Sequence, residues 1–190
     1  MTKKVLFATS NQNKVDEAKR YLGGLGIEVL PIDNNQILEN LYEIQNNDPE
    51  EVVLSKLKQI STVISEPVII DDFSFSIDGL NGFPGPYTKY VVSTLGLSEI
   101  CNLANSKSAT MTSYIGFYDG RNNFQVFKGT LTGKIIEKFD TSTFVNGKAQ
   151  LNSIFIPNGF DKTAEVLSSD PNFSNHRSLA LKELFNYLKV

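Results

Sequence analysis

The sequence predicts an α/β protein built on a mixed sheet, and three features carry this prediction. The short apolar run "KKVLFAT" is typical of a buried strand and leads directly into a helix-like stretch. A second helix-like stretch precedes "PVIID", a compact run rich in β-branched residues. Further along, "ATMTSYIGFYD" and "NFQVFKGTLTGKII" are strand-like and separated by a short glycine-containing turn, which indicates an antiparallel hairpin. Alternating strands and helices followed by a hairpin predict parallel and antiparallel pairing in one sheet.

The first helix is expected within "SNQNKVDEAKRYLGGLG", directly after the first strand. Ser10 or Asn11 can cap its N-terminus, and the glycines that follow the apolar residues can end it. The apolar residues recur at helical spacing: Val15, Ala18, Tyr21 and Leu22. The chain therefore begins with a strand, a tight turn and a helix.

The same order repeats in the next segment. "IEVLPI" indicates a second strand, and "DPEEVVLSKLKQISTVI" indicates a second helix. In this helix Asp48 is the expected cap and Pro49 lies in the first turn, where its missing N–H costs nothing.

Two adjacent carboxylates, Asp71 and Asp72, are expected to end the strand "PVIID". That place is where an open α/β sheet usually keeps its ligand site. Alternation along a strand sends the two side chains to opposite faces, so both cannot point into one site. One carboxylate can hold Mg²⁺ while the other binds a second ion or orients a water, because a hard divalent cation prefers oxygen ligands. The alternative is a strand end with two solvated acids.

The 190 residues contain no linker, repeat or low-complexity tract, so we expect a single domain over residues 1–190. The hairpin is expected to form a smaller lobe at about residues 107–140. "LNSIFIP" is a further strand candidate, and "NHRSLALKELFNYLKV" is expected to close the chain as an amphipathic helix. The apolar stripe of this helix comprises Leu179, Leu181, Leu184, Phe185 and Leu188.

The composition excludes several classes of function. A formal net charge of −3 leaves no broad basic surface, so no nucleic acid polymer is expected as a partner. The single cysteine, Cys101, excludes an internal disulfide and a zinc site of several thiolates. Its apolar surroundings, "LSEICNLA", favour burial over a role as nucleophile. The apolar run near the N-terminus is too short for a signal peptide or a membrane span, so we expect a cytoplasmic protein without a membrane partner.

The turn "TSNQNK" is suited to phosphate binding. It places polar side chains, free backbone N–H groups and Lys14 at the start of a helix, where the N–H groups and the helix dipole attract anions. Together with Lys56 and Lys89, Lys14 supplies three cations that can converge on a polyphosphate. In the alternative interpretation, Ser10 and Asn11 only cap the helix and each lysine is solvated.

His176, the only histidine, stands beside Arg177 at the start of the terminal helix. One imidazole cannot form a histidine metal cluster, and no serine or cysteine lies in a nucleophile motif, so triad chemistry is set aside. The functional interpretation is a pair that contacts a ligand. The alternative is a helix-start histidine bonded to the backbone.

Several motifs occur together in a fixed order along the chain: "TSNQNKVDE", "LYEIQ", "IIDDFSFSIDGLNGFPGPYTKY", "FIPNGFDKTAEV" and "NHRSLAL". In this order the chain resembles the Ham1 family of inosine triphosphate pyrophosphatases, from about residue 3 to the C-terminus. The resemblance implies an elongated mixed-sheet α/β fold with two lobes around a central cleft, and a homodimer. It also implies Mg²⁺-dependent hydrolysis of a nucleoside triphosphate, such as ITP or XTP, to the monophosphate and pyrophosphate.

The resemblance also implies roles for individual residues. Glu43, in "LYEIQ", matches a metal-binding glutamate, and Asp72 matches the aspartate that binds Mg²⁺ and accepts a proton. Asp71 stands where the family usually has glutamate, and it is assigned to the metal site as well. Lys14 and Asp72 are the two residues assigned as catalytic. The positions that match phosphate contacts are Thr9, Ser10, Asn11, Lys14, Lys56 and Lys89.

The base-recognition half departs further from the family pattern. Phe73 puts a bulky ring beside Asp72, and Ala149 replaces an aromatic residue expected to stack on the base. A stacked aromatic is worth about 1–3 kcal/mol per base, so its loss predicts weaker binding and lower purine selectivity. Phe73, Phe139 and Phe144 are the rings that could compensate. Three residues match the family's base-side positions: Asn152, His176 and Arg177, and Asn152 stands where the family has an aspartate. Pro171 replaces an expected lysine, and Asn175 replaces an expected serine.

Three hypotheses remain at this point. The first is an active nucleoside triphosphate pyrophosphatase with an altered base preference. The second is a catalytically impaired nucleotide-binding member of the family, and the third is a structural partner that uses the family dimer surface. The first is preferred because loss of function should erode the metal site as well, whereas Glu43 and Asp72 are both present.

Overall fold

The computed structural model describes residues 3–32, 35–104, 107–139 and 150–189. The chain forms two units, each with its own internal contacts. The first unit comprises Met1–Asp72, Ser113–Gly129 and Arg177–Val190, and the second comprises Phe73–Thr112 and Thr130–His176. Residues 107–140, the expected smaller lobe, are therefore shared between the two units.

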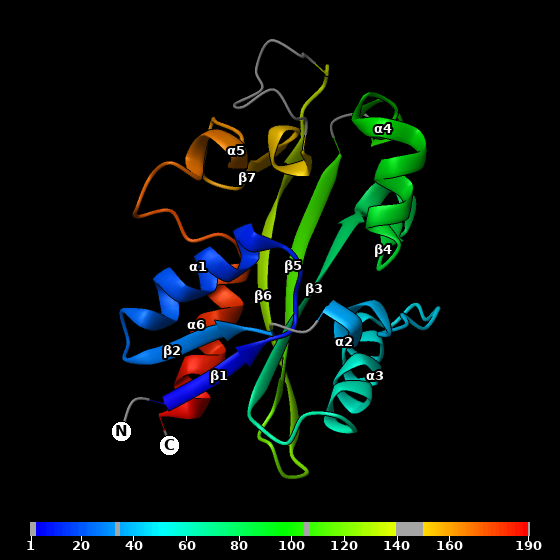
Figure 1. Cartoon of the computed structure of the whole chain (residues 1–190). Helices are drawn as coiled ribbons and strands as arrows, with labels where there is room; N and C mark the ends of the chain where they lie inside the picture. Colours follow the sequence, from blue (N-terminus) through cyan, green and yellow to red (C-terminus); the bar gives the residue numbers. More distant parts are fainter. Residues whose placement is uncertain (1–2, 33–34, 105–106, 140–149, 190) are drawn as a thin grey trace. The chain divides into compact units, whose positions relative to one another are not determined.

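The sheet contains parallel and antiparallel pairs, as predicted (Figure 1). Its order is β2-β1-β3-β5-β6-β7, with β4 paired to β3. Strand β1 pairs in parallel with β2 and β3, whereas β4 is antiparallel to β3 and β7 is antiparallel to β6. The strands are β1 (Lys3–Phe7), β2 (Ile27–Pro31), β3 (Val68–Ile77), β4 (Pro84–Gly85), β5 (Ser108–Tyr118), β6 (Phe124–Ile135) and β7 (Phe155–Pro157).

The helices confirm the expected start and stop signals. Asn11 caps α1, which ends at Gly23, and Asp48 caps α3, whose first residue is Pro49. The α-helices are α1 (Gln12–Gly23), α2 (Asn35–Glu39), α3 (Pro49–Ser61), α4 (Thr88–Ala104), α5 (Ala164–Leu167) and α6 (His176–Leu188). Two 3₁₀ turns, η1 (Asp78–Leu80) and η4 (Leu151–Ser153), complete the set that positions the residues of interest.

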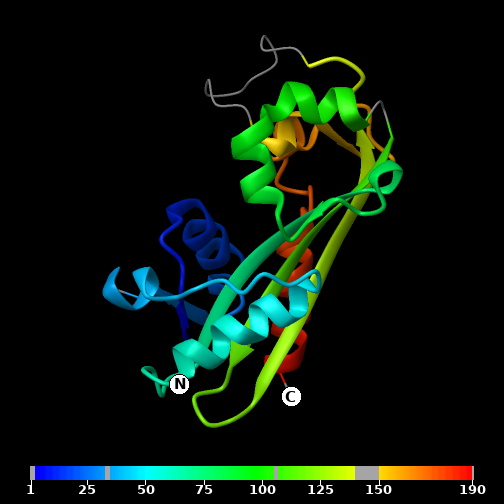
Figure 2. The same ribbon diagram turned by 90° about the vertical axis from the view of Figure 1, so that its right-hand side faces the viewer.

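In the first unit, helices cover both faces of the sheet (Figures 1 and 2). Helices α1 and α6 pack on one face, where Ile69 of β3 and Ile115 of β5 are fully buried. Helix α3 packs on the other face, against Val68 and Ile70 of β3. Successive residues of β3 therefore alternate between the α1–α6 face and the α3 face.

The second unit has a separate core beneath α4. Phe75 and Ile77 of β3 and Phe155 of β7 are almost fully buried in it. Helix α4 bends at Gly96, whose φ of 78° and ψ of 164° lie outside the helical region (Figure 2). Cys101 is 1% exposed on this helix, and burial raises the pKa of its thiol to about 11, which confirms the buried, unreactive cysteine.

One sequence prediction about strands was wrong, and a second was confirmed only in part. Strand β3 does not end at Asp71 and Asp72 but runs on to Ile77, because Phe75 and Ile77 enter the second core and the strand pairs with β4 at residues 75 and 76. "LNSIFIP" is a strand only at Phe155–Pro157, since Leu151–Ser153 forms η4. There Ser153 Oγ accepts from the Gln150 N–H at 3.0 Å and donates back to its carbonyl, a local pattern that competes with strand pairing.

No helix within the described ranges is long and apolar enough to span a membrane.

Candidate active site

The turn between β1 and α1 is shaped by its own side chains. Thr9 Oγ1 accepts from the Asn11 N–H at 3.1 Å. Asn11 Oδ1 accepts from the N–H groups of Asn13 at 3.0 Å and Lys14 at 3.4 Å. The capping role considered for Asn11 is therefore confirmed, while Ser10 is exposed. This cap fixes the first turn of α1 and with it the start of the Lys14 side chain.

Lys14 reaches from α1 to the middle of β3. Its Nζ lies 2.7 Å from the backbone oxygen of Asp71 and 3.1 Å from Asp71 Oδ2. The Lys14 side chain is 19% exposed, so it is neither solvated as the alternative expected nor sealed from solvent. One residue, Asp71, therefore provides both acceptors of this ammonium group.

Asp71 is a fully buried carboxylate, with a side-chain exposure of 0%. Its Oδ2 also accepts from Arg177 Nε at 2.6 Å. Burial by itself raises the pKa of Asp71, but the positive charges of Lys14 and Arg177 outweigh it and hold the pKa below its ordinary value. Asp71 is therefore ionised at neutral pH, and among the described residues no group donates a hydrogen bond to its Oδ1.

Arg177, in the first turn of α6, links two carboxylates. Besides Asp71, it contacts Glu17 of α1 through Nη1, and both the Arg177 and the Glu17 side chains are largely buried. Burial disfavours the charged guanidinium, yet the two anions dominate and raise the pKa of Arg177. Arg177, predicted as a substrate contact, is thus held in a buried ion pair by β3 and α1.

Asp72 and Glu43 meet on the opposite face of β3, at one cation. Lys56 Nζ of α3 lies 2.8 Å and 2.7 Å from the two carboxylate oxygens of Asp72 and also contacts Glu43 Oε2. Glu43 is 56% exposed and Asp72 25% exposed, whereas Lys56 is only 14% exposed. Two predicted metal ligands and one predicted phosphate contact are therefore brought together.

Partial burial and the neighbouring charges both shift the pKa values of Asp72 and Lys56. Burial raises the pKa of Asp72 above its ordinary value, more than the attraction of Lys56 lowers it. For Lys56, burial lowers the pKa, but the nearby carboxylate of Asp72 outweighs it and the net change is upward. Lys14 also lies close enough to lower the pKa of Asp72, so the cluster and the Lys14–Asp71 pair share one electrostatic environment.

The segment that carries Glu43 is fastened to α3. Gln59 Oε1 accepts from the Tyr42 N–H at 3.1 Å, and Gln59 Nε2 donates to the Tyr42 carbonyl at 3.0 Å. Because Gln59 follows Lys56 by less than one helical turn, this double contact holds Glu43 beside the Lys56 ammonium.

The donor set suits a hard divalent cation in its chemistry. Glu43 and Asp72 supply carboxylate oxygens from two separate segments, and they already converge on one cation, the ammonium of Lys56. Asp71 does not join them, because its side chain leaves β3 on the other face. Within the described residues no group of three or more Asp, Glu, His or Cys side chains is placed to hold a metal. Substrate oxygens or waters would have to complete the shell, as is usual for Mg²⁺.

The remaining predicted contacts belong to the second unit. Lys89 is exposed in the first turn of α4, and Asn152 is half-buried on η4. His176 is 6% exposed, and the centroid of its ring lies 4.9 Å from the centroid of the Phe73 ring. Phe73, the bulky departure from the family pattern, is thus a packing partner of this histidine.

The rings considered as replacements for a stacking aromatic are only partly described. Phe73 and Phe139 pack against the core of the second unit. Phe144 and Ala149 lie outside the described residues. Pro171 is exposed.

Sequence reasoning missed two residues of this arrangement. Glu17 lies three positions after Lys14 on α1, and Gln59 lies three positions after Lys56 on α3. Residues spaced by three share a helix face. A search for polar residues three positions from each lysine could therefore have identified Glu17 and Gln59 from the sequence.

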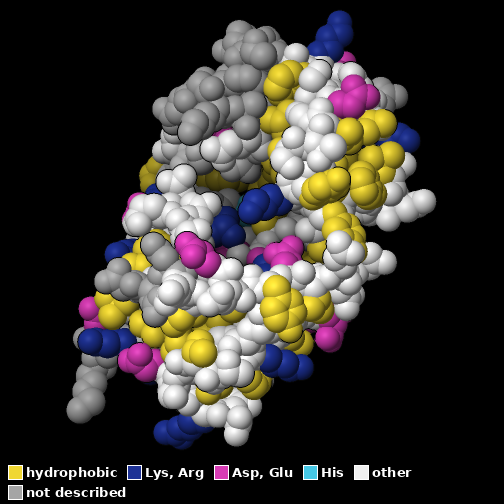
Figure 3. All heavy atoms as spheres, turned by 45° about the vertical axis from the view of Figure 1, so that its right-hand side comes forward, with side chains coloured by type: hydrophobic (Ala, Val, Ile, Leu, Met, Phe, Trp, Pro, Cys, Tyr) yellow, Lys and Arg dark blue, Asp and Glu magenta, His cyan; other side chains and the backbone are white. Residues whose placement is uncertain are grey.

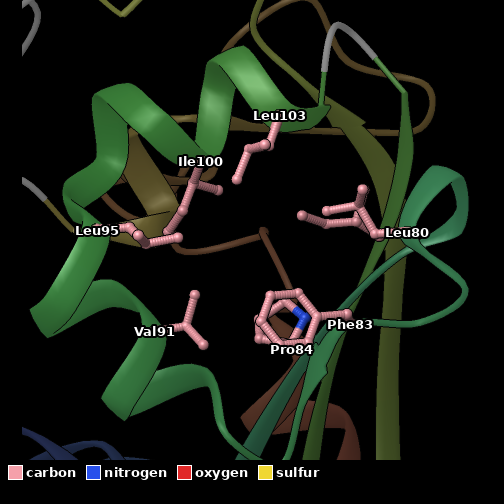
Figure 4. Close-up of a pocket in the computed structure, with 8 residues that line it drawn as sticks. Leu80, Phe83, Pro84, Val91, Leu95, Ile100 and Leu103 are labelled. Atoms are coloured by element: carbon pink, nitrogen blue, oxygen red, sulfur yellow. The ribbon is translucent and has the colours of Figure 1, made fainter.

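A small pocket in the second unit is apolar throughout (Figure 4). Figure 4 shows side chains from α4, such as Val91 and Leu103, facing Leu80, Phe83 and Pro84. It contains no group that could bind a phosphate or a metal. Figure 3 shows Lys and Arg side chains interspersed with acidic and hydrophobic ones on the visible face, without a broad basic field.

Comparisons with known proteins support one family. The model of the Ham1 family matches residues 5–187. The chain is 35% identical to a dITP/XTP pyrophosphatase of Thermococcus kodakarensis, over 98% of this chain and 97% of that protein. It is 38% identical to a protein of the same name from Pyrococcus horikoshii, with the same coverage.

Solved structures share the fold. A HAM1 protein from Coxiella burnetii aligns with a TM-score of 0.76 at 20% identity, covering 98% of each chain. The Staphylococcus aureus Ham1 protein aligns with a TM-score of 0.72 at 22% identity, again over 98% of each chain. With the family match across nearly the whole chain, these findings show that the protein is a member of the Ham1 family.

Proposed function

We propose that this chain is a Mg²⁺-dependent nucleoside triphosphate pyrophosphatase that converts a triphosphate such as ITP or XTP to the monophosphate and pyrophosphate. The observation that carries the proposal is the cluster on the α3 face of β3, where Glu43 and Asp72 converge on the Lys56 ammonium. The relatives named dITP/XTP pyrophosphatase support the choice of reaction and of substrate class.

Glu43 and Asp72 are the residues that would hold the metal. When bound there, Mg²⁺ would neutralise phosphate charge and favour the attack of water on phosphorus. The fit rests on the oxygen donors and on their convergence on a cation from separate segments.

The reaction needs one proton acceptor and a positive environment for the leaving group. In hydrolysis between the α and β phosphates, water oxygen bonds to the α phosphorus, the bridging P–O bond breaks, and pyrophosphate leaves. Asp72 is the proposed acceptor of the water proton. Lys14 and Lys56 are the proposed partners of the phosphate oxygens, and their ammonium groups would stabilise charge that develops on the leaving pyrophosphate.

The turn before α1 is the proposed phosphate cradle. Thr9 and Asn11 already shape it, so its backbone is set before a ligand arrives. Ser10 is exposed and free of such a shaping role in the described structure. Lys89 is proposed as a further phosphate contact, and the base would be contacted by Asn152, His176 and Arg177.

A catalytically impaired, nucleotide-binding member of the family is the second candidate. The observation that favours it is the contact between Phe73 and His176, whose ring centroids lie 4.9 Å apart, because the proposed base-contacting ring already has an aromatic partner. Such a protein would bind nucleotide without turnover.

A substrate panel separates the two candidates. Pyrophosphate release is measured with Mg²⁺ and ITP, XTP, dUTP and the common nucleotides, for the wild type and for Asp72→Asn. Asp161→Asn is the matched control, because Asp161 is exposed and outside the cluster. The expected result is pyrophosphate release that Asp72→Asn slows by about 10²–10⁴-fold and that Asp161→Asn leaves unchanged. Tight nucleotide binding without release of pyrophosphate from any member of the panel would favour the second candidate.

The family resemblance also predicts a homodimer. Light scattering coupled to size exclusion measures this directly, with an expected mass of twice the 21.1 kDa of one chain.

A further inference from the structure

We propose that Asp71 is a positioning residue that holds the Lys14 ammonium for phosphate binding, and that it is not a metal ligand. This inference rests on the proposed function, because it assumes that Lys14 binds a phosphate group. It assigns the second acid of the adjacent pair a role different from that of Asp72.

The geometry around Lys14 carries the proposal. Among the described residues, the two acceptors that contact its Nζ both come from Asp71: the backbone oxygen at 2.7 Å and Oδ2 at 3.1 Å. Lys14 has a long flexible side chain, and two acceptors on one rigid strand restrict where its ammonium can lie. The remaining N–H can then be offered to a phosphate without a search through rotamers.

Arg177 explains how the buried carboxylate of Asp71 can position Lys14 and still remain paired. Its Nε lies 2.6 Å from Asp71 Oδ2, closer than the Lys14 Nζ. When Lys14 engages a phosphate and its contact with Asp71 weakens, Arg177 keeps the carboxylate paired. An unpaired charge in a side chain of 0% exposure would be strongly unfavourable.

Glu17 completes the charge balance on this face of β3. It contacts the other end of the Arg177 guanidinium, so two anions face two cations. The guanidinium is thereby fixed at both ends, and Asp71 is held from β3, α1 and α6.

The same geometry argues against metal binding by Asp71. Its side chain lies on the α1–α6 face of β3, whereas Asp72, Glu43 and Lys56 meet on the α3 face. Its Oδ2 already serves two cations, and its Oδ1 is buried.

A thermodynamic cycle on pyrophosphate binding tests this inference. The wild type, Lys14→Met, Asp71→Asn and the double variant are titrated with inorganic pyrophosphate by calorimetry in EDTA. Lys14→Met is expected to weaken pyrophosphate binding when it is made in the wild type. If Asp71 acts through Lys14, the same change should weaken binding much less in the Asp71→Asn background, and the two effects on the dissociation constant should differ by about tenfold. Asp71→Glu, which keeps the charge, is expected to restore most of this coupling.

Two further measurements make the test specific. Glu28→Gln removes an exposed carboxylate of β2 whose ion-pair partner is Lys4, so its coupling to Lys14→Met is expected to be near onefold. Binding of Mn²⁺, followed by electron paramagnetic resonance, is expected to be unchanged in Asp71→Asn and weakened in Asp72→Asn. If Asp71→Asn alone does not fold, the charge-neutral combination Asp71→Asn with Arg177→Gln takes its place in the cycle.

Several outcomes would overturn the inference. They are additive effects of the Lys14 and Asp71 changes, weakened Mn²⁺ binding in Asp71→Asn, or no pyrophosphate binding by the wild type. The test is separate from that of the proposed function, because it requires no hydrolysis. A coupling found in a protein without turnover would support the positioning role while the enzymatic proposal failed.

Discussion

Replacing Arg177 by methionine is expected to destabilise the first unit strongly. The change leaves the fully buried Asp71 with Lys14 as its remaining cation and removes the ion pair between Arg177 and Glu17. Breaking a buried ion pair from one side costs about 3–5 kcal/mol. Because Lys14 still compensates Asp71, we expect the lower end, about 3 kcal/mol in the free energy of unfolding.

Thermal unfolding followed by far-UV circular dichroism measures this loss. For a chain of this length, about 3 kcal/mol corresponds to a fall in Tm of about 6–12 °C. The matched control is Lys4→Met, which removes the ion pair with Glu28 at 3.7 Å, where the side chains are 68% and 44% exposed. An exposed pair of this kind contributes about 0–1 kcal/mol, so the control should unfold close to the wild type.

The pH dependence of unfolding provides a second measurement on the Arg177→Met variant. The folded-state pKa of Asp71 lies below its ordinary value of 3.8, so its contribution is present above that value and is lost as the pH falls through the folded pKa. Arg177→Met removes one cause of the low pKa. The variant should therefore lose less stability than the wild type between neutral pH and acid. An Arg177→Met variant as stable as Lys4→Met, with an unchanged acid profile, would refute the reasoning.

Three further predictions concern other parts of the chain. Asp72→Asn should lower kcat for pyrophosphate release by about 10²–10⁴-fold with an unchanged circular dichroism spectrum, because it removes the proposed proton acceptor; near-normal turnover would exclude that role. Asn11→Ala should cost about 1 kcal/mol in unfolding free energy because it removes the α1 cap, and Asn11→Ser should recover most of it; equal stability of all three proteins would contradict the capping assignment. Cys101, with a buried thiol and a pKa of about 11, should resist a thiol reagent until urea unfolds the chain, so rapid labelling of the folded protein would contradict its placement.

Local patterns predicted the elements of the first unit well. The cap residues Asn11 and Asp48, and the apolar spacing of α1, α3 and α6, each correspond to an observed helix. These signals depend on neighbours a few residues apart, so a single sequence contains them in full. The alternation rule also separated Asp71 from Asp72, and the structure places them on opposite faces of β3.

Other features depend on contacts between distant segments. The continuation of β3 beyond Asp72 reflects burial of Phe75 and Ile77 in a second core, which the run "PVIID" does not reveal. The pairing of Arg177 with Asp71 joins residues 106 positions apart, and no local spacing predicts it. Resemblance to the family pointed to Asp71 as a metal ligand, whereas its neighbours in the fold point to a counter-ion for Lys14 and Arg177.

The most direct test of the enzymatic proposal is the identity of the products. ³¹P nuclear magnetic resonance of ITP incubated with the chain and Mg²⁺ resolves inosine monophosphate and pyrophosphate from the diphosphate and orthophosphate. We expect the monophosphate and pyrophosphate in equal amounts, formed about 10²–10⁴-fold more slowly by Asp72→Asn. Formation of the diphosphate and orthophosphate, or products from Asp72→Asn at the wild-type rate, would contradict the enzymatic proposal.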